Sequence, residues 1–213
     1  MMKHFKLSDL SFTILNIVND KDYNPQMTHL DYIYGMCDNL YSKEPNMDAE
    51  IPKLNVFRCD KKPKDIMQLI VMGYVFNERA MNLLNAINLP DHSLYPLQYI
   101  HKKNWYETNY LVMKKRLEDY IDYQKTTFVY KINKEDSYIP IPIVDHADYL
   151  EKVKQIKYVE CRELILTDEG YNIDLFYSFI FCDFICTEKF RKVYHDLKLS
   201  GLTFSEISKF MIY

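Results

Sequence analysis

The hydrophobic pattern is clearest between residues 65 and 97, where apolar runs flank a short amphipathic segment. An apolar run ends at Phe76, and Asn77 then stands where its side-chain oxygen can accept a hydrogen bond from a free amide in the first helical turn. Glu78 places a negative charge at the positive end of the helix dipole. Apolar residues follow at the spacing of one helical face, namely Ala80, Leu83, Leu84 and Ile87. The pattern predicts a strand, a capped helix and a second strand.

The same pattern recurs 110 residues later. Thr187 takes the place of Asn77 as the N-cap, and Glu188 takes the place of Glu78. Gly201 ends the second helix. The apolar positions of that helix are Phe190, Val193, Tyr194 and Leu197. Any two amphipathic helices preceded by strands align in this way, so the pattern fits both a structural repeat and a coincidence.

The rest of the chain predicts further short strands and one further helix. Residues 149–156 form the helical pattern. Strand patterns cover 53–59, 105–113, 128–130, 138–144 and 161–166. The predicted fold class is therefore α+β: a mixed or antiparallel sheet with a few short helices packed on it, arranged in two related strand–helix–strand halves if the repeat is structural. We expect a single domain over 1–213, with 1–60 as an accessory N-terminal lobe and 61–213 as the main core.

Composition favours a cytoplasmic protein that needs neither disulfides nor metal to fold. A chain of 213 residues can bury a sizeable core, and its five Cys are odd in number and scattered. Neither a signal peptide nor an apolar stretch near the roughly 18 residues of a membrane span is visible. The net charge is −3, whereas nucleic-acid binders usually carry a basic excess. We therefore expect no membrane and no nucleic-acid partner.

The sequence shows no recognisable catalytic, cofactor-binding or metal-binding motif. The six His form no ligand pair, and four Gly leave little scope for a glycine-rich anion loop. Cys182 and Cys186 are too far apart on a strand to share one metal, so we expect core thiols. His146 lies between two Asp residues, and we interpret 145–148 as a turn rather than as an oriented base. The prediction is a non-enzyme without cofactors.

Three stretches resemble one protein family. Residues 187–207 resemble the closing segment of bacterial polymorphic-toxin immunity proteins, in which a "(S/T)-E-K-hydrophobic" helix start precedes "Gly-hydrophobic-x-Phe". Residues 119–128 resemble the central "(Y/C)-I-D-x-x-K-(S/T)-x-(F/Y)" segment of the immunity protein 11 and 43 families, with Thr126 where Ser is commoner. The Asn77-Glu78 helix start resembles a third shared feature. The resemblance covers about residues 60–207 and none of the first 50.

The resemblance implies a cytoplasmic protein that binds and neutralises a cognate toxin domain without catalysis. Such inhibitors present aromatic anchors and often an acidic patch. We expect partner-binding residues among the acidic and aromatic positions Glu118, Asp119, Asp122, Tyr123, Asp136 and Tyr138. Two alternatives stay open: an enzyme or small-molecule-binding protein, and a self-associating structural or regulatory module. A pocket with converging polar groups would favour the first, and a large self-complementary apolar patch the second.

Overall fold

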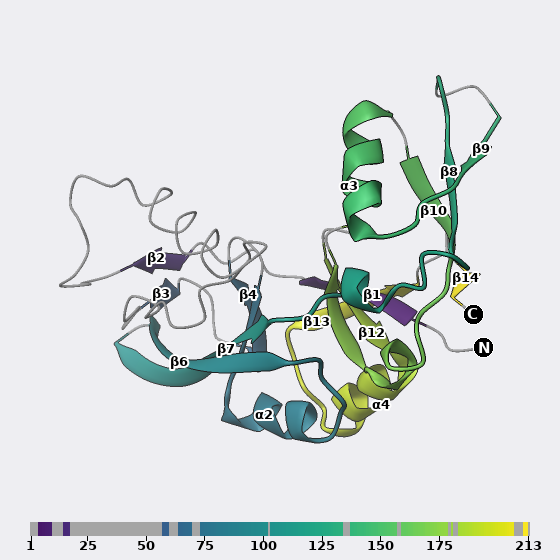
Figure 1. Cartoon of the computed structure of the whole chain (residues 1–213). Helices are drawn as coiled ribbons and strands as arrows, with labels where there is room; N and C mark the ends of the chain where they lie inside the picture. The colour runs from purple at the N-terminus through teal and green to yellow at the C-terminus, as the bar shows by residue number, and fades with distance from the viewer. Residues whose placement is uncertain are drawn as a thin grey trace.

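A computed structural model describes residues 4–9, 15–17, 57–59, 64–69, 73–101, 103–133, 137–156, 159–178, 180, 183–206 and 211–212 (Figure 1). The predicted accessory lobe, 1–60, falls almost wholly outside these residues, so the division at residue 60 stays a prediction. Asp136 and Cys182 also lie outside them.

The described strands form three sheets (Figure 1). The first has the spatial order β2 (Leu15–Ile17), β3 (Phe57–Cys59), β6 (His92–His101), β7 (Asn104–Met113), β5 (Gly73–Phe76), β4 (Ile66–Leu69). The second has the order β11 (Leu175–Ser178), β12 (Asp183–Thr187), β1 (His4–Asp9), β13 (Leu202–Glu206). The third has the order β14 (Met211–Ile212), β10 (Val159–Leu164), β8 (Thr127–Tyr130), β9 (Ile139–Ile141).

The α+β prediction is confirmed. Strand pairs are antiparallel except β3 with β6 and β10 with β14, so the first and third sheets are mixed. The α-helices of the described chain are α2 (Glu78–Asn85), α3 (His146–Gln155) and α4 (Glu188–Asp196), with 3-10 turns η1 (Leu117–Tyr120) and η2 (Gly170–Asn172). Both predicted N-caps are confirmed, because Asn77 Oδ1 and Thr187 Oγ1 accept from the amides of Ala80 and Phe190. The predicted turn at 145–148 is wrong: Asp145 is an N-cap and α3 begins at His146.

The two similar halves share one strand plan. The first unit is β4, β5, α2, β6 and β7, in which β7 lies between β5 and β6. The second unit is β11, β12, α4, β13 and β1, in which β1 lies between β12 and β13. Registers agree at the 110-residue offset: Leu94 faces Leu111 across β6 and β7, and Phe204, 110 positions after Leu94, faces Leu7 across β13 and β1. The repeat is therefore structural, and the N-terminal strand supplies the fifth element of the second unit.

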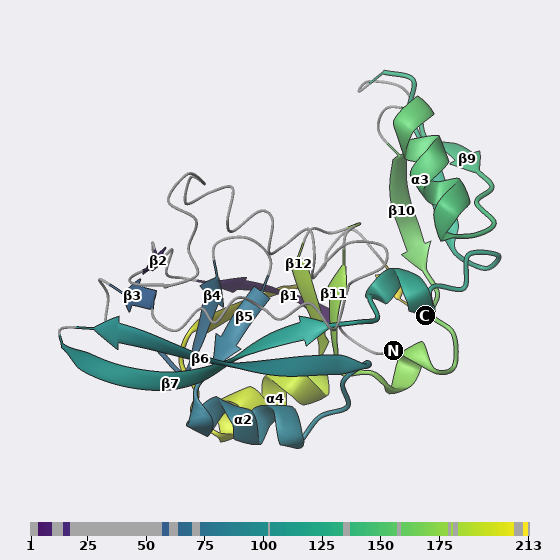
Figure 2. The same cartoon turned by 60° about the vertical axis from the view of Figure 1, so that its left-hand side comes forward.

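Helices α2 and α4 lie side by side on one face of the two sheets (Figure 2). They run antiparallel, because Asn88 after α2 bonds Asp174 near the start of α4 while Ser200 after α4 bonds Asp65 near the start of α2. One apolar core joins both units and includes Leu83 and Phe190. Burying this face stabilises each helix, since isolated helices of eight or nine residues are marginal in water.

The second sheet has two buried faces. Leu175 and Tyr177 of β11 point into the core shared with α2 and α4, whereas Phe176 between them joins a second core. This alternation follows from the two-residue period of a strand. The second core also contains Phe128 of β8 and Leu164 of β10, so it fastens the third sheet to the body.

Candidate protein-binding surface

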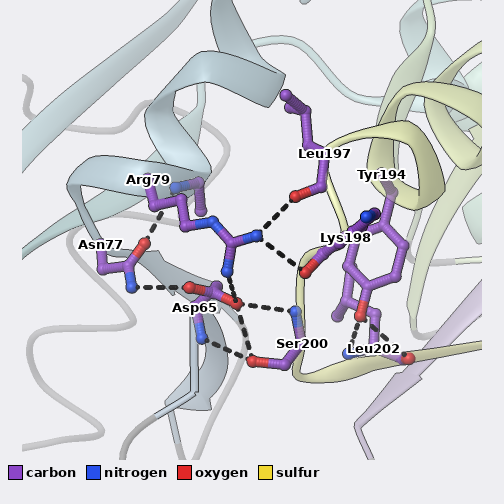
Figure 3. Close-up of polar contacts among 9 residues, drawn as sticks. Asp65, Asn77, Arg79, Tyr194, Leu197, Lys198, Ser200 and Leu202 are labelled. Carbon is purple, nitrogen blue, oxygen red and sulfur yellow. Dashed lines mark hydrogen bonds and ion pairs between the residues drawn. The ribbon is translucent and has the colours of Figure 1, made fainter.

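A polar network of the described chain surrounds Asp65 (Figure 3). Asp65 Oδ2 accepts from the Ser200 amide at 2.8 Å and from Ser200 Oγ at 2.7 Å. Asp65 Oδ1 accepts from Asn77 Nδ2 at 3.0 Å, and Arg79 Nη1 lies 3.6 Å from Oδ2. Arg79 Nη2 also donates to the carbonyls of Leu197 and Lys198, at the end of α4. The network thus ties the start of α2 to the end of α4.

The network keeps the Asp65 carboxylate charged. Burial on its own would raise the pKa of Asp65, but hydrogen bonds from Ser200 and Asn77 and the positive charge of Arg79 lower that pKa below its ordinary value. The carboxylate oxygens have donors on several sides. Because these donors occupy its oxygens, the Asp65 carboxylate has a structural role and is a poor general base.

A second network of the same design surrounds Asp174. Its carboxylate accepts from Thr187 Oγ1 at 2.8 Å, from Lys189 Nζ at 2.7 Å and from the Asn88 amide at 2.8 Å. In each unit an Asp before the first strand therefore binds the helix N-cap, a basic residue in the first turn, and the loop after the opposite helix. The repetition of this design with different donors indicates a structural role for both networks.

Large exposed apolar side chains gather on the third sheet and its helix, which project from the body (Figures 1 and 2). Within the described residues, Trp105 on β7 is the one large exposed hydrophobic that lies elsewhere. The others are Ile132 (65 % exposed), Ile139 (37 %), Val144 (65 %) and Val153 (43 %), which we call the α3 surface, and Tyr138 (38 %), which lies on the opposite face of the third sheet with Lys131 and Arg162. Because five of the six large exposed hydrophobics among the described residues lie at this end, it is the best candidate for a binding surface.

Helix α3 holds its position with little burial, since none of its residues is fully buried. The Asp148 amide donates to Asp145 Oδ1 at 2.8 Å, and Asp148 Oδ2 accepts from the Val144 amide at 2.9 Å. Lys152 Nζ lies 2.8 Å from Asp148 Oδ2 and also donates to the Pro142 carbonyl. Hydrogen bonds from Lys152 and Val144 hold the pKa of Asp148 below its usual range. These contacts fasten the helix to the segment after β9 and leave its outer face open.

An aromatic cluster supports α3 from below. Tyr123 Oη lies 3.0 Å from His146 Nδ1, and the Tyr123 ring stacks on Phe128 of β8 with centroids 6.0 Å apart. Phe128 in turn contacts Tyr149 of α3 at 5.6 Å between centroids. Burial, with the nearby negative charges of Glu118 and Asp119, raises the pKa of Tyr123 well above its ordinary value. Tyr123 is therefore a neutral packing residue whose hydroxyl positions His146.

The predicted partner-binding residues do not form one surface. Placing Glu118 on the surface is wrong, because it is 4 % exposed and its Oε1 accepts from Ser178 Oγ and the Ile180 amide. Asp119 is exposed but accepts from the Arg116 amide at 2.7 Å, which caps η1. Asp122 pairs with Lys125 at 2.7 Å. Tyr138 is exposed, but on the face of the third sheet opposite α3, where it contacts Glu160 and Arg162. Asp136 lies outside the described residues. The proposed binding role of these residues stays a prediction.

Sequence reasoning missed the aliphatic part of the surface. Ile132, Val144 and Val153 stand in segments where no apolar period is strong, so nothing marked them as exposed. The sequence did contain one signal in the short helix: Leu150 and Val153 do not belong to a continuous apolar stripe along that helix. When a helix next to a proline-rich strand has only a weak apolar stripe, we expect the rest of the protein to cover that helix only in part.

The described residues contain no group of three or more His, Cys, Asp or Glu side chains that could hold a metal ion. Cys186 is buried, as expected of a core thiol, whereas Cys182 lies outside the described residues. Cys161 is buried too, and burial raises its pKa to about 12. No described helix combines the length and the apolar character needed to cross a membrane. A scan against protein-family models gives no match, and a search of curated proteins gives no significant match either.

Proposed function

We propose that this protein is a non-catalytic, cytoplasmic inhibitor of the immunity type, which binds a cognate toxin domain through the α3 surface. The observation that carries the proposal is the gathering of exposed apolar side chains on one projecting end. The resemblance of residues 119–128 and 187–207 to toxin immunity proteins supports the kind of partner.

The composition of the surface suits a protein partner. Exposed apolar patches mark protein-interaction sites, and the α3 surface carries Ile132, Ile139, Val144 and Val153. Val153 stands on a capped helix and Ile139 on a β-hairpin strand, so little order has to be gained on binding at these two positions. Our proposal assigns the protein no nucleic-acid, membrane or cofactor partner.

The proposal is tested by co-expressing the protein with the toxin domain encoded beside its gene and scoring survival and co-purification. Ile132→Asp and Val153→Asp should each weaken the complex at least tenfold, because a buried charge replaces an apolar anchor. Trp105→Asp is the matched control: Trp105 is 59 % exposed on β7, away from α3, and its variant should bind normally. Circular dichroism should show all three folded.

Three results would count against the proposal. If the co-expressed domain is not toxic and forms no complex with this protein, it is not the partner. A Trp105→Asp variant that fails while the α3 variants bind normally moves the interface to the β6–β7 hairpin. Concentration-dependent dimers in light scattering that Val153→Asp dissolves would instead identify the α3 surface as a self-association site.

A further inference from the structure

The third sheet and α3, which we call the arm, project from the body (Figure 2). Besides the link to the C-terminal strand β14, two passages of the chain join the arm to the body: 120–126 leads into β8, and 165–167 follows β10. Ile121 and Leu166 form an antiparallel bridge between these passages, and the Thr167 amide donates to the Tyr120 carbonyl at 2.8 Å. We call the two bonded passages the neck.

The strand ladder is interrupted at the neck. Its nearest pairs are Ile121 with Leu166 on the body side and Thr127 with Glu163 on the arm side. Between these pairs one side of the ladder runs through 122–126, whereas the other side contains only 164–165. Because the two sides differ in length, backbone groups alone cannot pair across this gap one for one.

Thr126 closes the gap with its side chain. Its hydroxyl donates to the Ile165 carbonyl at 3.2 Å and accepts from the Ile165 amide at 3.1 Å. These are the two bonds that an opposing strand residue would make. The same carbonyl also accepts from the Asp122 amide at 2.8 Å. The turn that places Thr126 is fixed by its own amide, which donates to the Asp122 carbonyl at 2.9 Å, and by the Asp122–Lys125 ion pair at 2.7 Å.

The hydrogen bonds of the neck constrain the arm in a way that its apolar contacts do not. The second core joins Phe128 and Leu164 of the arm to Phe176 of the body. Apolar attraction is non-directional, whereas hydrogen bonds weaken steeply away from their preferred angle. The core therefore keeps the arm attached, and the paired bonds at Ile165 resist its rotation.

We propose that Thr126 is a positioning residue for the α3 surface: its hydroxyl closes the neck and thereby fixes the direction in which the arm presents that surface to the protein partner. The inference rests on the proposed function, because it concerns how the same surface is presented. It also gives a role to the stretch 119–128, which resembles toxin immunity proteins yet contributes no residue to the α3 surface.

The direction of the arm can be measured in the full-length protein. Thr126→Val removes the hydroxyl and nearly keeps the shape of the side chain, and residual dipolar couplings of backbone amides report how the arm is oriented relative to the body. One alignment tensor should fit both parts of the wild type, whereas Thr126→Val should require two. Thr126→Ser keeps the hydroxyl and should restore the single tensor.

Thr108→Val is the matched control. Thr108 is 5 % exposed against 8 % for Thr126, and its hydroxyl donates to the Phe76 carbonyl at 3.1 Å within the first sheet. The variant therefore loses a buried hydroxyl bond away from the neck, and a single tensor should still fit it.

Toxin binding should follow the direction of the arm, although Thr126 lies outside the α3 surface. If only about a fifth of the Thr126→Val molecules hold the competent direction, the apparent affinity for the co-expressed toxin domain falls about fivefold. Thr126→Ser and Thr108→Val should bind as the wild type does.

Each outcome decides the matter. A single tensor for Thr126→Val, or two tensors for Thr108→Val as well, overturns the inference. Full toxin binding by Thr126→Val alongside loss of binding by Val153→Asp also overturns it and leaves the proposed function standing. If the wild type forms no toxin complex while Thr126→Val requires two tensors, the proposed function fails and Thr126 still directs the arm.

Hydrogen exchange of the wild type decides the case in which Thr126→Val does not fold. An Ile165 amide as protected as the amides of the β8–β10 ladder supports closure of the neck by Thr126. An Ile165 amide that exchanges as fast as an exposed loop amide contradicts it.

Discussion

The two units of this protein share one strand order, but the strand that completes each sheet comes from a different part of the chain. In the first, β7 comes directly after β6 in the chain and pairs with it along its whole length. In the second, the equivalent place beside β13 is filled by β1, about 200 residues away along the chain, in the same register. Strand order and register are therefore set by the packing of side chains and by ladder hydrogen bonds, and the covalent connection between strands is secondary.

The units also differ in the donors around the two network aspartates, Asp65 and Asp174. Asp65 has an amide N-cap and an arginine, whereas Asp174 has a hydroxyl N-cap and a lysine. Both nevertheless accept the backbone amide of the loop after the opposite helix at 2.8 Å. The backbone contact is thus the shared element, and the side-chain donors vary around it.

We expect the largest loss of stability from a substitution at Gly201, where the backbones of the two units come into contact. Its φ is +119°, and an added Cβ would lie 1.8 Å from the Ile66 carbonyl oxygen. We expect Gly201→Ala to destabilise the protein by about 4 kcal/mol, because backbone conformation and contact are both disallowed. Asp91, its counterpart 110 positions earlier, is exposed, and Asp91→Ala should cost less than about 1 kcal/mol. Urea denaturation measures both, and equal values would show that the join is not as close as described.

A proline in β1 tests whether the N-terminal strand is an integral part of the second unit. Lys6 faces Ile185 on one side and Ser205 on the other, so its amide belongs to a central strand. Lys6→Pro should destabilise the protein by about 3 kcal/mol by removing a ladder hydrogen bond. Lys6→Val keeps the amide and should be nearly neutral. If thermal unfolding of Lys6→Pro matches that of Lys6→Val, β1 does not occupy this place in solution.

The charge of Asp65 should have a smaller effect on stability, and one that depends on pH. Because its folded-state pKa lies below the ordinary 3.8, its charge stabilises the protein fully above about pH 4 and progressively less as pH falls through the lowered pKa. Asp65→Asn should therefore be less stable than wild type by about 1–2 kcal/mol at pH 7. The gap should narrow below pH 4. A gap that stays constant down to pH 2 would mean that charge contributes nothing at this position.

Local features of this fold could be predicted from the sequence and long-range ones could not. The caps Asn77 and Thr187 were predictable because a cap depends on residues three positions away. The pairing of β1 depends on residues that the sequence pattern does not connect to it. Glu118 was expected on the surface because glutamates are rarely buried, yet Ser178 and Ile180, about 60 positions on, provide its donors. The α3 surface was missed for the same reason, because the exposure of a side chain depends on which distant segments of the chain pack against it.

The position of β1 also orders events during synthesis on the ribosome. β1 leaves the ribosome before every other described element, yet both of its neighbours, β12 and β13, are among the last to be made. The first unit can close as soon as β7 has been translated, while the N-terminal segment waits with its backbone amides unpaired. A pairing of such high contact order forms slowly. Any chaperone that assists this protein during synthesis would therefore meet it with the first unit assembled and β1 still without its neighbours β12 and β13.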